Sequence, residues 1–106
     1  MFGALKSMFG GGSEAVAQAM DNNAVVIDVR TPAEFSGGHV AGSKNIPLNE
    51  LGAKLSSLSK ETPVVFCCAS GGRSGSATTM AKNAGYDAHN GGPWTNVNRL
   101  VADRTK

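Results

Sequence analysis

Two adjacent cysteines, Cys67 and Cys68, follow an apolar run at residues 63–66 and lead directly into a glycine-rich loop. Glycines in such a loop can adopt backbone angles closed to other residues, so successive peptide N–H groups can converge on one anion. We expect that anion to be the sulfur of a deprotonated cysteine. The residues expected to bind it, or a substrate anion, are Ala69, Ser70, Gly71, Gly72, Arg73 and Ser74.

A helix is expected to begin near Ser74, with its positive dipole end directed at the loop. Arg73 is expected to add a full positive charge. Together these features should lower the cysteine pKa well below about 8.5 and so provide a thiolate at neutral pH. Such a thiolate can attack an electrophilic sulfur, phosphorus or arsenic centre. The segment therefore predicts an enzyme that works through a nucleophilic thiol.

The doubled cysteine allows two interpretations of the loop. Counted from Cys68 the pattern is Cys-x-x-Gly-x-Arg, and counted from Cys67 it is Cys-x5-Arg followed by serine. Side chains alternate along a strand, so the two thiols should point to opposite faces of a sheet. We expect Cys67 to be a core residue, with a resolving or sulfur-relay role as the alternative.

Two further blocks accompany the loop. Residues 24–35 followed by 38–48 resemble the paired N-terminal motifs of the rhodanese family, and residues 90–94 resemble its closing Gly-Gly turn with a nearby tryptophan. The Cys68 frame is similar to the rhodanese loop, with Gly71 three residues after the cysteine. The Cys67 frame resembles the cysteine-dependent phosphatases, but places Ser70 where those enzymes carry glycine. The resemblance covers residues 24–94 in the family's order.

This resemblance implies a single-domain sulfurtransferase that carries a persulfide on Cys68. The implied donor is thiosulfate or a similar small anionic sulfane compound, and the acceptor is cyanide, a thiol or a protein. Asp28 and Arg30 are expected to form structural ion pairs. The resemblance also implies that Asp28 can help to orient the site. No metal or organic cofactor is implied. A phosphatase or arsenate reductase, and a persulfide carrier or redox module without turnover, stay open as alternatives.

Length, charge and cysteine content are consistent with this interpretation. The chain has 106 residues and a net charge of +2, which predicts one domain and gives no reason to expect a nucleic-acid partner. Adjacent cysteines lie about 3.8 Å apart at Cα, too close for an ordinary structural disulfide. We therefore expect the protein to work in the cytoplasm, where thiols stay reduced. We also expect it to be a monomer. Residues 1–12 are expected to form a hydrophobic segment and glycine linker without a membrane span, and residues 13–106 the rhodanese-like domain.

The hydrophobic pattern predicts alternating strands and helices. Strands are expected at 24–29, 43–46, 63–67 and 86–89. Helices are expected from Ser13, after the capping box at 31–34, over 48–58 and 93–102, and from Ser74. This order predicts an α/β fold with a mostly parallel sheet of about four to five strands and helices on both faces. The helix after the loop should bury Ala77, Met80, Ala81 and Ala84.

Overall fold

The computed structural model describes residues 11–104, so most of the predicted N-terminal segment lies outside the described residues. The first described helix, α2, spans Gly11–Asp21 and begins two residues before Ser13, where the sequence had predicted the cap. Within residues 11–104, no helix combines the length and the apolar character needed to cross a bilayer.

Four strands form the central sheet: β1 (Val25–Asp28), β2 (Lys44–Asn45), β3 (Val64–Cys68) and β4 (Ala88–Pro93). Their order is β2-β1-β3-β4, and every neighbouring pair is parallel. The predicted α/β class and parallel sheet are therefore confirmed. Parallel strands end at the same edge, and in such sheets that edge is where ligands bind. Cys68 is the last residue of β3 and lies at this edge.

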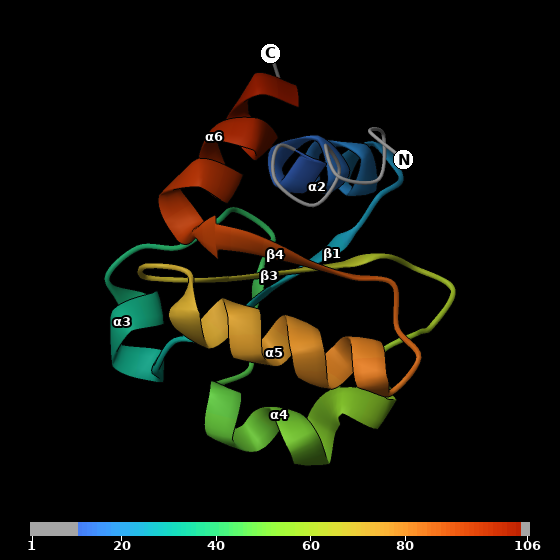
Figure 1. The fold of residues 1–106 in the computed structure, drawn as a ribbon. Coiled ribbons are helices and arrows are strands. Elements are labelled where there is room, and N and C mark those ends of the chain that lie inside the picture. The colour runs from blue at the N-terminus through green and yellow to red at the C-terminus, as the bar shows by residue number, and fades with distance from the viewer. Residues whose placement is uncertain (1–10, 105–106) are drawn as a thin grey trace.

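Helices cover both faces of the sheet (Figure 1). One face carries α4 (Leu48–Lys54), its short 3₁₀ continuation η1 (Leu55–Ser57) and α5 (Gly72–Asn83), and the other carries α2 and α6 (Trp94–Arg104). The short helix α3 (Pro32–Ser36) lies beside the start of α5 (Figure 1). Its predicted capping box is present: the Thr31 hydroxyl accepts from the Glu34 N–H, and the Glu34 carboxylate accepts from the Thr31 N–H.

The two faces of β3 contribute to two separate cores. Phe66 and Cys68 pack with α4 and α5, whereas Val65 and Cys67 pack with α2 and α6. All four residues are buried. The alternation predicted for the two cysteines is therefore what the structure has, with Cys67 a core residue and Cys68 on the α5 side.

The buried face of α5 differs from the prediction. Its buried residues are Ser74, Ala77, Thr78 and Ala81. Met80 is 38% exposed and Ala84 is also exposed, so the prediction for these two was wrong. Apolar character alone was misleading, because small polar side chains can be buried once they are hydrogen-bonded. The Thr78 hydroxyl, for example, donates to the Ser74 carbonyl at 2.7 Å.

Strand β4 extends further than predicted, through the two glycines to Pro93. Its pairing with β3 shifts between Phe66, which pairs with Asn90, and Cys67, which pairs with Gly92. Gly91 is thus the extra residue of a bulge. A Cβ atom at Gly91 would lie 2.6 Å from Val97 Cγ2 and 3.0 Å from the Phe66 carbonyl oxygen, so this strand can approach its neighbours only with glycine there.

Replacement of Gly91 by alanine should therefore destabilise the fold. Overpacking of this kind costs about 1–3 kcal/mol, because neighbouring side chains and backbone must move. The matched control is Gly52→Ala in α4, where a Cβ meets nothing within 4 Å and where alanine favours the helix by about 0.5–1 kcal/mol. Urea unfolding of both variants measures the difference. Equal stability of the two variants would contradict the close packing described at Gly91.

Candidate functional site

The turn from β3 into α5 is short and tightly constrained. Cys68 ends the strand, α5 begins at Gly72, and Gly71 between them has φ of 109°. That angle lies in the left-handed region, which favours glycine. A Cβ atom on Gly71 would lie 3.6 Å from the Gly92 Cα, so the turn also rests on the bulged end of β4.

The sulfur of Cys68 lies inside this turn. The Gly71 N–H donates to Sγ at 3.0 Å and the Ser74 N–H at 3.4 Å. The Ser74 hydroxyl oxygen is 3.3 Å from the same sulfur. Cys68 has no exposed surface, whereas the next two residues of the loop, Ala69 and Ser70, are exposed and small.

The pKa values of the two cysteines move in opposite directions. For Cys68, burial raises the pKa, but hydrogen bonds from the Ser74 hydroxyl and from the N–H groups of Ser74, Gly71 and Ser70 outweigh it and lower the pKa below its ordinary value. For Cys67, burial dominates, and with the nearby Asp28 carboxylate it raises the pKa to about 12. The geometry thus favours a thiolate at Cys68 and a neutral thiol at Cys67.

Among the described residues, Arg73 gives no hydrogen bond to the Cys68 sulfur. Its charge still interacts with Cys68: the hydrogen bond to Glu34 is the main cause that raises the Arg73 pKa, and Cys68 is a weaker one. The Arg73 guanidinium binds the Glu34 carboxylate through two hydrogen bonds, of 2.7 Å and 3.1 Å. The hydrogen bond from Arg73, followed by that from the Thr31 N–H, lowers the Glu34 pKa to about 2. Arg73 therefore ties α5 to α3, and the hydrogen bonds to Cys68 come from uncharged groups. The sequence identified Glu34 only as a cap, because nothing in its local pattern indicates a partner in the later loop.

Asp28 and Arg30 form a buried ion pair at the end of β1. The Arg30 guanidinium donates to both Asp28 oxygens, with the shortest contact at 2.7 Å, and also to the Gly38 carbonyl at 2.6 Å. It lies 5.0 Å from the centroid of the Trp94 ring, within the range of a cation–π contact. The structural role expected for the pair is present, and it joins β1 to the 38–40 segment and to α6. No hydrogen bond links Asp28 to Cys68 among the described residues.

One residue at the site was not identified as such from the sequence. Asn90 Oδ1 accepts a 2.7 Å hydrogen bond from the Ser74 hydroxyl and a 2.9 Å bond from the Gly92 N–H. Its Nδ2 donates to the Gly71 carbonyl at 3.3 Å. The position of Asn90 directly before the two glycines was the one sequence feature that could have indicated its role. Its contact with the 68–74 loop, however, depends on the pairing of β3 with β4.

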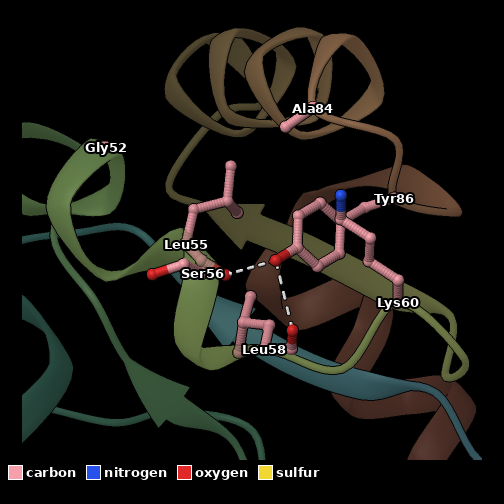
Figure 2. A pocket seen from close by; sticks show the side chains of 7 residues that line it. All are labelled: Gly52, Leu55, Ser56, Leu58, Lys60, Ala84 and Tyr86. Carbon is pink, nitrogen blue, oxygen red and sulfur yellow. Dashed lines mark hydrogen bonds between the residues drawn. The ribbon is translucent and has the colours of Figure 1, made fainter.

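Figure 2 shows a cavity of about 550 Å³ whose lining includes no residue of the 68–74 loop. Its lining residues are Gly52, Leu55, Ser56, Leu58, Lys60, Ala84 and Tyr86. The Tyr86 hydroxyl lies within hydrogen-bond distance of the Leu55 carbonyl, at 2.7 Å, and of the Leu58 carbonyl, at 3.1 Å, and Lys60 Nζ lies 5.3 Å from the ring centroid. This lining contains neither a thiol nor a carboxylate, and the Tyr86 hydroxyl is engaged in holding η1. Within residues 11–104, no cluster of three metal-ligating side chains is present.

Comparison with known proteins agrees with this geometry. The profile of the Rhodanese-like domain family matches residues 13–92. The Bacillus subtilis protein YqhL is 41% identical over 68 residues, which are 63% of this chain and 54% of that protein. The thiosulfate sulfurtransferase GlpE of Pseudomonas aeruginosa is 32% identical over 73 residues, which are 69% of this chain and 66% of that protein.

Solved structures extend the comparison to the fold. The structure titled rhodanese with anions, from E. coli, superposes with a TM-score of 0.64 at 32% identity. The superposition covers 68% of this chain and 88% of that one. This chain spans only about half the length of YqhL and about two thirds of the length of GlpE.

The geometry of the loop predicts that Ser74 influences Cys68 more strongly than Arg73 does. Replacement of Ser74 by alanine removes the hydroxyl but keeps the N–H, and should raise the Cys68 pKa because the thiolate loses one donor. Replacement of Arg73 by alanine should cause a smaller rise. The rate of alkylation of Cys68 by iodoacetamide, followed against pH, measures both shifts. A larger pKa shift in the Arg73 variant would instead identify the charge of Arg73 as the main influence on the Cys68 pKa.

Proposed function

The chain belongs to the rhodanese-like family, and from that premise we propose that it is a sulfurtransferase that works through a persulfide on Cys68. The main support is one observation: the Cys68 sulfur accepts hydrogen bonds from backbone N–H groups at the start of α5. Donors fixed in this way stabilise a sulfur anion without having to reorganise when charge appears.

In the first step, the Cys68 thiolate attacks the outer sulfur of thiosulfate or a similar sulfane donor. A bond forms between Sγ and that sulfur, and the original bond of the donor breaks. Sulfite leaves with the bonding electron pair, and a persulfide remains on Cys68. Sulfite is stable as an anion, so no general acid is needed, in agreement with the absence of an acid on the loop from 68 to 74.

In the second step, cyanide or a thiolate attacks the terminal sulfur of the persulfide. The sulfur–sulfur bond breaks, and its electron pair returns to Cys68 as the thiolate. The N–H donors of Gly71 and Ser74 therefore stabilise both the attacking group of the first step and the leaving group of the second. The small, exposed residues Ala69 and Ser70 also leave room for a protein acceptor.

The phosphatase and arsenate reductase alternatives have less support. In the Cys67 frame the nucleophile would be a buried thiol with a pKa of about 12, packed on the α2 and α6 side of the sheet. In either frame the loop arginine, Arg73, is held by Glu34 and not directed at the sulfur. A phosphatase would use that cation to bind the equatorial oxygens of a phosphoryl group.

The small-molecule partners of this proposal are a sulfane donor, with thiosulfate first because GlpE is named for it, and a thiol or cyanide as acceptor. The two free cysteines suit a reducing compartment such as the cytoplasm. We further propose that residues 13–106 form the catalytic domain, which acts as a monomer without a metal or organic cofactor.

Replacement of Cys68 by serine should abolish transfer of sulfur from thiosulfate to cyanide. The corresponding Cys67→Ser variant should keep most of the activity, because Cys67 lies in the core on the opposite face of β3. Mass spectrometry after incubation with thiosulfate should show one added sulfur on the wild type and on the Cys67 variant only. An inactive Cys67→Ser variant together with an active Cys68→Ser variant would overturn the assignment of Cys68 as the nucleophile. One added sulfur without turnover to cyanide or a thiol would identify a carrier in place of an enzyme.

The size of the loop predicts the class of substrate. The cradle runs from Cys68 to Arg73, and we expect it to accept a single sulfur but not the three equatorial oxygens of a phosphoryl group. Hydrolysis of an aryl phosphate should therefore be negligible beside sulfur transfer. Insertion of one glycine between Gly71 and Gly72 should depress sulfur transfer by displacing the N–H donors. Wild-type phosphatase turnover that exceeds sulfur transfer would contradict the proposal.

A further inference from the structure

The Ser74 hydroxyl has one hydrogen and three acceptors within reach. The Asn90 Oδ1 atom is the nearest at 2.7 Å, followed by the Gly71 carbonyl oxygen at 3.2 Å and Cys68 Sγ at 3.3 Å. A hydroxyl can donate only one hydrogen at a time. The side chain of Asn90 thus competes with the reactive sulfur for a single donor.

The orientation of the Asn90 amide is fixed by its other neighbours. The Gly92 N–H can only donate, so the amide atom 2.9 Å from it is the oxygen Oδ1. The Nδ2 atom faces the Gly71 carbonyl, which can only accept. Oδ1 therefore keeps one donor, Gly92, even when the Ser74 hydroxyl turns away.

This arrangement favours a different hydroxyl orientation for each protonation state of the sulfur. While Cys68 is a thiol, its S–H can donate to the Ser74 oxygen, and the Ser74 hydrogen goes to Asn90. Once the thiol proton has left to solvent, the charged sulfur accepts the Ser74 hydrogen, and the Ser74–Asn90 bond is given up. Charge-assisted hydrogen bonds are the stronger kind, which makes this exchange favourable in the thiolate.

We propose that Asn90 is a positioning residue, which holds the Ser74 hydroxyl away from Cys68 in the thiol state and so limits the thiolate population of the resting site. This inference deepens the proposed function and rests on it in taking Cys68 as the reacting thiol. Its readout is the reactivity of the thiol itself and requires no sulfur transfer.

Other ionisable groups packed around the thiol are engaged with each other, which leaves the hydroxyl as the adjustable donor. Arg73 of α5 binds Glu34 of α3, and Asp28 of β1 binds Arg30. Cys67 of β3 is a neutral thiol below a pH of about 12. The remaining pairs on the neighbouring elements are Glu50 with Lys54 on α4 and Asp87 with His89 at β4.

The test compares Asn90→Leu with Asn90→Asp by the pH dependence of Cys68 alkylation. Leucine has a similar branched shape but no acceptor, so the Gly71 carbonyl is the one competitor left for the Ser74 hydrogen beside the sulfur, and the Cys68 pKa should fall by about half a unit. Below that pKa this is about a threefold increase in alkylation rate, since the thiolate fraction changes tenfold per unit. Aspartate keeps the acceptor and adds negative charge, so the pKa should rise. The control is Asn96→Leu, on the exposed surface of α6.

A purely structural role for Asn90 predicts that the Cys68 pKa changes in the opposite direction. If its removal only loosened the turn, the N–H donors would move away, and the Cys68 pKa would rise in the leucine variant. A rise or no change there therefore overturns the proposal. If the leucine variant does not fold, as judged by thermal unfolding, the aspartate variant decides by comparison with the same variant in a Ser74→Ala background. A larger rise in pKa when the hydroxyl is present supports the proposal, and an equal rise in both backgrounds, which the added charge alone would cause, overturns it.

The same measurement in a Ser74→Ala background tests whether Asn90 acts through the hydroxyl. Without that hydroxyl, Asn90→Leu should leave the Cys68 pKa unchanged, because the two effects are coupled. An equal fall in both backgrounds would overturn the route through Ser74. Failure of the proposed function would appear elsewhere, as a Cys68 thiol that alkylates as described here but accepts no sulfur from thiosulfate.

Discussion

The structure depends on one constraint: the backbone must turn from β3 into α5 within the few residues that follow Cys68, and must direct its N–H groups inward while doing so. Gly71 makes this possible with its positive φ, and the Gly71 and Ser74 N–H groups then reach the Cys68 sulfur. A sulfur in this position accepts from peptide groups that would otherwise lack partners at a helix start. The same hydrogen bonds therefore give partners to the N–H groups of the turn and stabilise the Cys68 sulfur.

The end of β4 supports that turn from the other side. Asn90 pairs with Phe66 just before the bulge and reaches the Gly71 carbonyl at the start of α5. The bulge at Gly91 then shifts the pairing so that Gly92 lies beside Cys67. The tight packing at Gly91, with neighbours under 3 Å from any added Cβ, is thus part of what aligns the site.

Ion pairs hold the surrounding segments in place without facing the sulfur. Asp28 is fully buried, and its charge is tolerated because Arg30 contacts both of its oxygens while the Arg30 N–H adds a third donor. Loss of one partner from such a buried pair costs about 3–5 kcal/mol, since the other charge is left uncompensated. The partly exposed Arg73–Glu34 pair contributes little stability by comparison, but it fixes the orientation of the loop arginine.

Local pattern was sufficient for the parallel sheet, the capping box of α3 and the opposite directions of Cys67 and Cys68, because each depends on periodicity or on residues close in sequence. It was insufficient for the buried face of α5, where Ser74 and Thr78 are buried through hydrogen bonds that hydrophobicity does not describe. It also missed the contacts of Arg73 with Glu34 and of Asn90 with Ser74. Those contacts join residues 39 and 16 positions apart, and only the strand pairing brings them together.

The donors that reach Cys68 are suited to some chemistries more than others. Peptide N–H groups and a hydroxyl stabilise a single negative charge on a large, polarisable atom, but they supply neither a proton for a leaving alkoxide nor a cation for several phosphoryl oxygens. Transfer of sulfane sulfur needs neither, because sulfite leaves as a stable anion and the charge stays on sulfur throughout. Arg73 gives its hydrogen bonds to Glu34, so the hydrogen bonds that the Cys68 sulfur accepts come from uncharged groups. The arrangement of Glu34, Arg73, Ser74 and Cys68 therefore favours sulfur as the group transferred.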